Sequence, residues 1–385
     1  MGIGVASFFS DLGHESATAI LPMFLVSIGA SPAALGTIEG VADAVSSFTK
    51  LAAGFYSDRL RKKKSVAASG YLLTGISTAS FAVATNWVHL LIGRGVGWLG
   101  RGIRGPVRDV ILSESIPAGD VGKAFGFDRA LDTAGAVAGP ILALWLVGFA
   151  SYRQIFLFSI IPGILAAISF AWIIREPPVS TVEPRSFRMS LKELPPEFRR
   201  FLLAVGVFGV GDFAHTLLIL RASQILSQSD PSGGSHTAVM LYVVHNVVYA
   251  SASYPVGALG DRIGRTTLLA IGYALAGAMC LGFLLPSPSV AIMLILFSAG
   301  GFYIAIEDSL ERAVAAELLP PTLRGTGFGV LASLNGFGDL ISSSTVGLLW
   351  STVSPEAGFL FAAVFSFGGA LFMRFGISRR SWPAS

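Results

Sequence analysis

The sequence predicts an all-α membrane protein whose twelve transmembrane helices form two pseudo-symmetric six-helix bundles. The first observation is composition: of 385 residues, 53% are hydrophobic and 13% are charged, against about 25% charged residues in an average soluble domain. The second is a mean hydropathy of +0.69, which leaves too few polar residues to cover a soluble surface. The third is an internal repeat, described below.

Apolar runs long enough to cross a bilayer recur along the whole chain. Each is longer than a transmembrane strand and lacks the alternation of a barrel, so helices are expected. Pairs of glycines four residues apart, such as Gly36 and Gly40 or Gly135 and Gly139, favour close helix packing. The predicted spans are residues 4–28, 33–56, 65–85, 88–112, 124–148, 154–174, 201–226, 238–259, 266–285, 289–314, 325–350 and 356–375.

Basic residues are distributed unevenly between the two sets of connecting loops. One set, together with the tail from residue 374, contains 18 Lys and Arg residues, whereas the opposite set contains only Arg153. Because cytoplasmic loops are enriched in Lys and Arg, both termini are predicted to be cytoplasmic in a multi-pass protein of the bacterial inner membrane. Basic residues placed in this way indicate contact with the lipid bilayer and not with nucleic acid.

A proline-rich segment divides the predicted spans six and six. We expect a first bundle in residues 1–175, a cytoplasmic linker in residues 176–200 and a second bundle in residues 201–385. Matches between the halves recur at a constant offset of 203 residues, which predicts a symmetry axis along the membrane normal. They include Gly54-x-x-x-Asp58-Arg59 with Gly257-x-x-x-Asp261-Arg262, Gly122-x-x-Phe125-Gly126 with Gly325-x-x-Phe328-Gly329, and Asp132 with Asn335.

With these motifs the sequence resembles the major facilitator superfamily (MFS) of transporters over essentially the whole chain. The segment Gly257-x-x-x-Asp261-Arg262-x-Gly264-Arg265 is similar to the superfamily's loop signature. Gly135-x-x-x-Gly139-Pro140 resembles the fifth-helix motif of drug/proton antiporters, which implies export. The resemblance also implies that the first and fourth helices of each half line a central pathway.

Placing an ionisable residue inside a membrane span costs free energy, so such residues indicate a functional site. Asp11, His14 and Glu15 share one face of the first span, and Asp212 and His215 lie at comparable depth in the seventh. Buried carboxylates can exchange protons with either side, so Asp11, Glu15 and Asp212 are candidates for proton coupling. Arg94 joins them because the resemblance associates its position with proton transfer. The substrate-binding candidates are His14, Glu15, Arg101, Asp212 and His215.

The fourth span carries an arginine face, and its charges are opposed in the tenth span. At the 203-residue offset, Arg104 corresponds to Glu307 and Arg108 to Glu311. These pairs are predicted to form a cytoplasmic gate latch between the halves, with ion pairing inside each half as the alternative. Asp128 and Asp132 of the fifth span lie at depths matching Arg104 and Arg101, so ion pairs between the fourth and fifth spans are expected. The remaining gate candidates are the loop-motif residues Asp58, Arg59, Asp261 and Arg262.

Together these features predict a secondary active transporter that works by alternating access. The expected activity is proton-coupled export of a small organic or anionic compound. The alternative is transport of a transition-metal ion or a metal chelate of the iron–citrate type, with Asp11, His14, Glu15, Asp212 and His215 as ligands. We expect a monomer that is not an enzyme and needs no cofactor. The Gly-x-Gly-x-x-Gly pattern at residues 95–100 does not indicate a dinucleotide site, because it lies inside a span with no preceding strand.

Overall fold

A computed structural model describes residues 2–57, 62–114, 121–174, 193–285, 289–320 and 323–376. Across these residues the chain is α-helical apart from one short 3-10 helix and the connections, and no strand occurs in them, which confirms the predicted fold class. The first half contains α1 (Gly2–Ser27), α2 (Pro32–Ser57), α3 (Lys63–Ala79), η1 (Ser80–Val83), α4 (Trp87–Glu114), α5 (Val121–Val147), α6 (Tyr152–Phe158) and α7 (Ile160–Ile173). The second contains α9 (Pro196–Gly209), α10 (His215–Ser229), α11 (Gly234–Ile263), α12 (Arg265–Gly282), α13 (Val290–Leu318), α14 (Arg324–Thr352) and α15 (Pro355–Phe375).

Local sequence signals explain where several helices begin. Ser151 starts α6 with a capping box, in which its side chain accepts a hydrogen bond from the Gln154 N–H and the Gln154 side chain accepts one from the Ser151 N–H. Ser289 and Ser354 cap α13 and α15 in the same position. Gly264 separates α11 from α12 with a φ of 97°, a conformation that favours glycine. Polar caps and glycine therefore set the turns between long apolar helices.

Each predicted span is present, but three are not single α-helices. The third ends in η1, and the sixth is divided at Ser159 into α6 and α7. The seventh, predicted as one helix over residues 201–226, consists of α9 and α10 separated by a non-helical segment at residues 210–214. This break contains Asp212, so the prediction of a continuous seventh helix is wrong at the position of a candidate site residue.

Length and apolar composition alone mark six of the described segments as membrane-crossing: Lys63–Val83, Ala130–Val147, Tyr152–Ile173, Arg265–Gly282, Val290–Leu318 and Pro355–Phe375. The helices α1, α2, α4, α10, α11 and α14 fall outside this set and carry most of the interior polar residues described below. Outward-facing apolar side chains such as Trp172, which is 84% exposed, present a surface suited to lipid.

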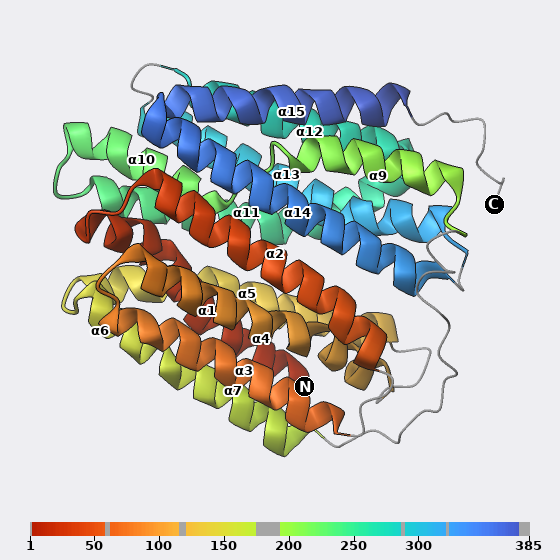
Figure 1. Ribbon diagram of the computed structural model, residues 1–385, viewed down its shortest axis with the longest axis horizontal. Coiled ribbons are helices and arrows are strands. Elements are labelled where there is room, and N and C mark those ends of the chain that lie inside the picture. Colours follow the sequence, from red (N-terminus) through yellow and green to blue (C-terminus); the bar gives the residue numbers. More distant parts are fainter. Residues whose placement is uncertain are drawn as a thin grey trace.

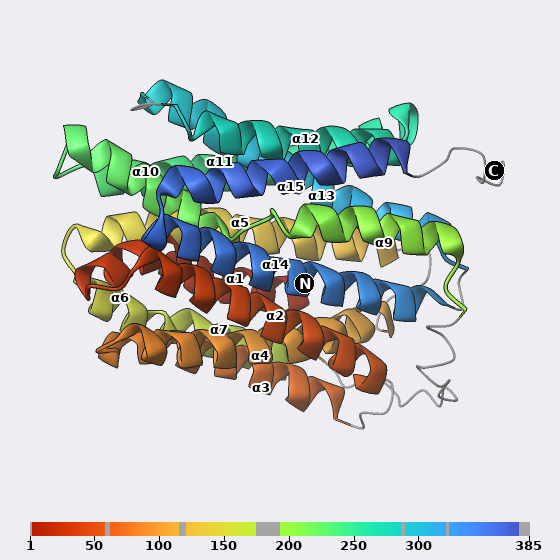
Figure 2. The ribbon, with the colours of Figure 1, turned by 45° about the horizontal axis from the view of Figure 1, so that its top comes forward.

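The helices form two bundles that lie side by side (Figures 1 and 2). The main contact between them runs along α2 and α14, and a second joins α5 to α11. Small residues allow the first: a Cβ added at Gly40 would lie 3.0 Å from Leu340 Cα, and one added at Gly36 would meet the Ser343 carbonyl oxygen. The boundaries of the two predicted domains remain a prediction, and most of the predicted linker lies outside the described residues.

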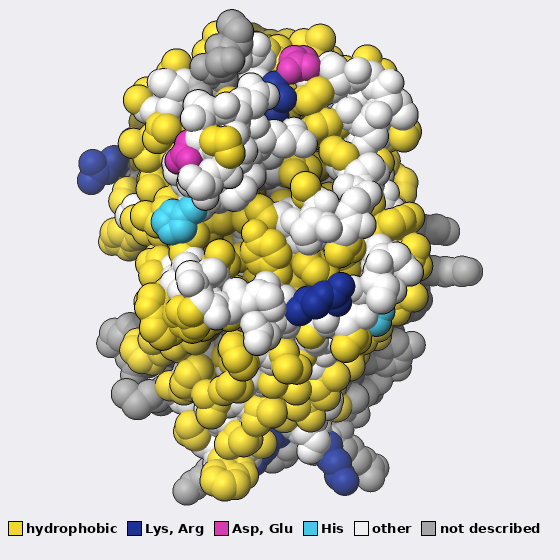
Figure 3. All heavy atoms as spheres, turned by 90° about the vertical axis from the view of Figure 1, so that its left-hand side faces the viewer, with side chains coloured by type: hydrophobic (Ala, Val, Ile, Leu, Met, Phe, Trp, Pro, Cys, Tyr) yellow, Lys and Arg dark blue, Asp and Glu magenta, His cyan; other side chains and the backbone are white. Residues whose placement is uncertain are grey.

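The two ends of the molecule differ in their surface chemistry. The end that carries the α1–α2, α5–α6 and α10–α11 connections shows mainly hydrophobic and neutral side chains with few charged ones (Figure 3). The start of α1 and the end of α15 lie toward the opposite end (Figure 1). The few charged side chains at the first end agree with the scarcity of basic residues in the loops predicted there.

Candidate functional site

One face of α1 carries three ionisable side chains well inside the protein. Asp11 and His14 are only 4% and 5% exposed, and Glu15 follows on the same face because residues three and four apart are neighbours on a helix. Arg101 of α4 donates to Asp11, with 3.2 Å between Nη2 and Oδ1. Two predicted candidates from different helices therefore form an ion pair in the interior of the first half.

His14 lies between α1 and α4. Its ring packs against the Trp98 ring with centroids 4.3 Å apart, and its Nε2 is 3.8 Å from Glu15 Oε1 and 3.4 Å from Thr18 Oγ1. These contacts hold the imidazole beside the Glu15 carboxylate.

Glu15 is connected to the second half through Tyr242 of α11. The Tyr242 hydroxyl donates to Glu15 Oε2 at 2.9 Å. One helical turn further, the Asn246 amide donates to the Ala136 carbonyl of α5 at 3.1 Å. Sequence reasoning missed Tyr242, although it shares a helix face with Asn246, an interior polar residue four positions later.

Arg94 forms the most complete buried ion pair. Its guanidinium donates to both oxygens of Glu39 in α2 at 3.0 to 3.1 Å and to Thr18 Oγ1 at 3.1 Å. The side chains of Arg94 and Glu39 are each 3% exposed. A fork-shaped guanidinium that meets a carboxylate through two nitrogens is a geometrically specific contact.

Trp98 organises the arginines around it. Its ring lies 4.1 Å from the guanidinium carbon of Arg94 and 5.6 Å from that of Arg101, within the range of cation–π attraction. Its indole Nε1 donates to Asp43 Oδ1 at 2.6 Å. Trp98 lies between Arg94 and Arg101 on α4, a position that sequence reasoning did not single out.

The remaining arginines of α4 pair inside the first half. Arg104 donates to Ser10 Oγ at 2.5 Å and lies over the Tyr71 ring at 4.1 Å. Arg108 Nη2 is 3.5 Å from Asp128 Oδ2. The expected ion pairing between α4 and α5 is therefore present, but Asp128 meets Arg108 and not Arg104, one helical turn away from the predicted partner.

The second half places Asp212 in the break between α9 and α10. Tyr303 of α13 donates to Asp212 Oδ1 at 3.0 Å. The interrupted backbone is satisfied by two fully buried serines of α14: Ser342 donates to the Asp212 carbonyl, and Ser343 accepts from the Ala214 N–H at 3.0 Å. Irregular backbone inside a membrane protein requires such partners.

His215 follows as the first residue of α10. Its ring centroid lies 4.6 Å from that of His245 and 6.5 Å from that of Tyr303. His215 therefore lies close to residues of both α11 and α13, and Glu15 of α1 contacts the second half through Tyr242.

Acidic residues of α13 lie close to Asp212. Glu307 of α13 interacts electrostatically with Asp212 and Glu311. Glu311 accepts from the Tyr273 hydroxyl at 2.5 Å and from the Asn335 amide at 2.8 Å. In this conformation Arg104, Arg108 and Glu311 bond residues of their own half, so the described residues form no latch between the halves, and the latch remains a prediction.

The loop motif occurs in both halves of the chain, and the copy in the second half lies within the residues that the structure describes. Asp58 and Arg59 lie outside the described residues. Arg262 lies in the last turn of α11. Arg265, the first residue of α12, forms ion pairs with Asp261 at 2.8 Å and with Glu317 of α13 at 3.1 Å. These pairs connect the start of α12 to two neighbouring helices.

The described residues contain no group of three or more His, Cys, Asp and Glu side chains that could hold a metal ion. The five residues of the alternative metal interpretation therefore do not come together as one ligand set in this conformation. Asp11, His14 and Glu15 belong to the α1 network, whereas Asp212 and His215 belong to the α13 network.

The two bundles and the polar networks at their centre define a multi-pass membrane transporter. The family model described as Major Facilitator Superfamily matches residues 3–228 and 202–383. The chain belongs to the major facilitator superfamily and is a secondary transporter. This confirms the resemblance that its loop motif suggested.

Individual relatives agree with this family. An uncharacterized MFS-type transporter of Methanocaldococcus jannaschii is 32% identical over 97% of this chain and 93% of its own length. The quinolone resistance protein NorA of Staphylococcus aureus is 27% identical over 45% of this chain and 44% of its own. The crystal structure of the nucleoside transporter NupG, 14% identical, covers 97% of this chain and 98% of its own with a TM-score of 0.80, which shows the shared fold.

Proposed function

We propose that this transporter exports a small organic or anionic compound in exchange for protons. The observation that carries the proposal is the bond from Tyr242 to Glu15, which joins the two halves at a carboxylate that is 15% exposed. Hydrogen bonds to an ionised acceptor are about twice as strong as those between neutral groups. Protonation of Glu15 therefore weakens a contact that holds the halves together.

Asp11 and Arg101 provide the complementary step. The side chain of Arg101 is 28% exposed and the side chain of Asp11 is 5% exposed, so the guanidinium is the accessible member of the pair. An anionic group of a substrate competes with Asp11 for Arg101, so cargo binding and the ionisation of Asp11 are coupled. Asp212, held by Tyr303 in the broken seventh span, is the corresponding carboxylate of the second half.

Export is favoured by the Gly135-x-x-x-Gly139-Pro140 motif and by the partial similarity to NorA. A metal chelate remains an alternative cargo, because its anionic ligand would bind Arg101 in the same way; a bare metal ion has less support from the described residues.

The uneven Lys and Arg distribution supports cytoplasmic termini. A C-terminal green fluorescent protein fusion tests this orientation, since that reporter fluoresces only on the cytoplasmic side.

Two measurements test the function. Purified protein is screened by thermal shift against norfloxacin, tetraphenylphosphonium, citrate, ferric citrate and divalent metals, and we expect saturable stabilisation by an organic or anionic probe. That probe is then moved in proteoliposomes that contain a pH dye, where Glu15→Gln is expected to abolish proton flux coupled to the probe. Glu356→Gln, which alters an exposed carboxylate paired with Arg221, is the matched control.

Probe flux that ignores an imposed pH gradient would exclude proton coupling. Saturable stabilisation by a bare transition metal, lost in His14→Ala, would replace the organic or anionic cargo with a metal ion.

A further inference from the structure

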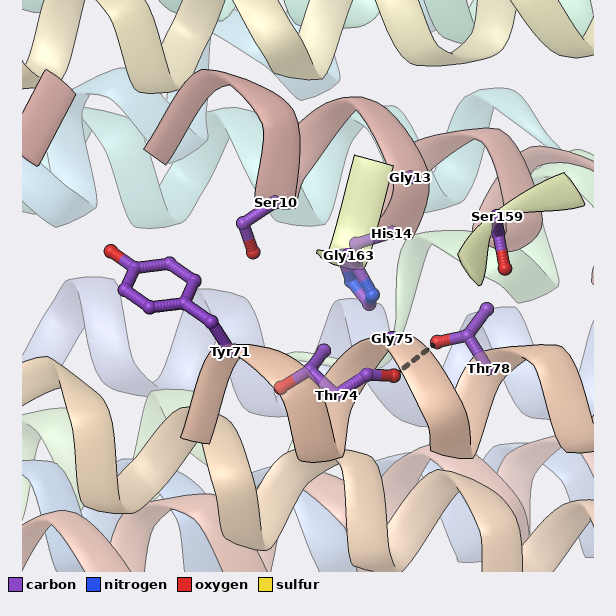
Figure 4. Close-up of a pocket in the computed structure, with 9 residues that line it drawn as sticks. All are labelled: Ser10, Gly13, His14, Tyr71, Thr74, Gly75, Thr78, Ser159 and Gly163. Carbon is purple, nitrogen blue, oxygen red and sulfur yellow. Dashed lines mark hydrogen bonds between the residues drawn. The ribbon is translucent and has the colours of Figure 1, made fainter. Parts of the chain in front are cut away.

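A small cavity with a partly polar lining lies within the first half, on the side of α1 that faces α3 and the α6–α7 break. It has a volume of about 10 Å³, the space that one water-sized sphere occupies. Its lining includes Ser10 and His14 of α1, Thr74 and Thr78 of α3, and Ser159 between α6 and α7 (Figure 4). All five are buried, with exposures from 4% to 6%.

His14 has one ring nitrogen without a hydrogen-bond partner. Its Nε2 lies near Thr18 and Glu15, but its Nδ1 is buried and makes no hydrogen bond within the protein. In either neutral tautomer Nδ1 is a donor or an acceptor, and in the charged ring it is a donor. A buried polar atom of this kind normally has a partner, and ordered water is a common one.

Three of the hydroxyls around the cavity already donate to backbone carbonyls. Thr74 donates to the Gly70 carbonyl at 2.9 Å, Thr78 to the Thr74 carbonyl at 3.0 Å, and Ser159 to the Phe156 carbonyl at 2.6 Å. Their oxygens can still accept a hydrogen bond. A water molecule can therefore donate to a hydroxyl oxygen while it donates to or accepts from His14, and it suits both tautomers of the ring.

Charge argues against a cation in the same place. Arg94, Arg101 and Arg104 all act on His14 electrostatically and repel positive charge. The Tyr71 hydroxyl is also buried without a hydrogen-bond partner, but it points away from the His14 ring and is not needed to bind the water (Figure 4).

We propose that this cavity is a hydration site that holds one ordered water bound to His14 Nδ1. The site does not depend on the proposed proton coupling. If that coupling operates, His14 lies between the Glu15 carboxylate and the bound water, so the imidazole can exchange a proton on the side of α1 away from the substrate pathway.

Water-edited solid-state NMR of protein labelled with 15N-histidine in lipid tests the site, with His14→Gln to assign the resonances. We expect magnetisation transfer from water to the Nδ1 of His14. His245 is the matched control, because it is 2% exposed and its Nδ1 is already 3.2 Å from the Phe297 carbonyl. Absence of transfer to His14 Nδ1, or equal transfer to His245, would overturn the proposal.

A cavity-filling variant separates this site from water that arrives through the substrate pathway. Thr78→Ile replaces a hydroxyl that bonds only within its own helix and adds volume to the cavity, so transfer to His14 Nδ1 should be lost. Thr352→Ile, at a residue with the same type of bond on the exposed end of α14, should leave the transfer intact. Should Thr78→Ile fail to fold, Ser159→Val introduces a valine that is larger than the native serine and fills the cavity from the α6–α7 side. Undiminished transfer in a folded filling variant would contradict the assignment.

Discussion

Tyr242 and Glu15 belong to different halves of the protein and share a hydrogen bond of 2.9 Å in its interior. We expect Tyr242→Phe to remove this bond without changing the packing of the ring. A hydrogen bond to a charged group contributes about 1.5–3 kcal/mol. The melting temperature should fall and proton-coupled flux of the probe identified by thermal shift should slow, whereas Tyr254→Phe, at a residue 87% exposed, should change neither.

Removal of Arg94 should be strongly destabilising because it leaves Glu39 buried without its partner. Breaking a buried ion pair on one side costs about 3–5 kcal/mol. Arg94→Met alone is therefore expected to lower the melting temperature more than Arg94→Met combined with Glu39→Leu. A double variant less stable than the single variant would show that the pair does not account for the loss.

Ser343 supports the interrupted seventh span. In Ser343→Ala the Ala214 N–H loses the hydroxyl that accepts its hydrogen bond, and an unsatisfied buried donor costs about 1–3 kcal/mol. Denaturation of the purified protein should detect this loss. The control is Ser298→Ala, where the exposed hydroxyl bonds a carbonyl of its own helix and the stability should not change measurably.

Gly36→Ala should separate α2 from α14, since its Cβ would collide with the Ser343 carbonyl oxygen. Overpacking of this kind costs about 1–3 kcal/mol. Gly95→Ala is the matched control, because nothing lies within 4 Å of its added Cβ and alanine favours the helix. Equal melting temperatures for the two variants would mean that the α2–α14 contact can relax.

The predicted cytoplasmic latch is tested by a charge swap. Arg108→Glu and Glu311→Arg should each impair flux, partly because Arg108 and Glu311 lose Asp128 and Tyr273 respectively. The double variant should recover part of the activity if the two positions meet when the cytoplasmic side closes. No rescue in any combination of Arg104 or Arg108 with Glu307 or Glu311 would end the latch hypothesis.

Hydropathy predicted the number and order of the spans because each must bury an apolar surface in lipid. It did not predict the break at residues 210–214, although Gly206, Gly209 and Gly211 lower the helix propensity there. The partners that stabilise the break, Ser342 and Ser343, come from a helix some 130 residues away in the sequence. A local pattern carries no information about such a partner.

The sequence predicted which residues of α1 belong to the candidate site, but not their partners on other helices. Helical spacing identified Asp11, His14 and Glu15 as one face, and the structure places them together. The partners across the interior depend on how helices rotate and shift against each other, which explains why Asp128 meets Arg108 and why Tyr242 was missed. Register between helices is set by side-chain packing at the contact and not by depth along one span.

The contact between α2 and α14 has a mechanical consequence. From Gly347 beside Ala33 to Gly329 beside Leu51, glycines bring the two helices together along nearly their whole length. Backbones packed this closely leave almost no room for the two helices to slide or separate. The two bundles can then rotate only about the α2–α14 contact, and the path for cargo must open on the sides of the molecule away from that contact.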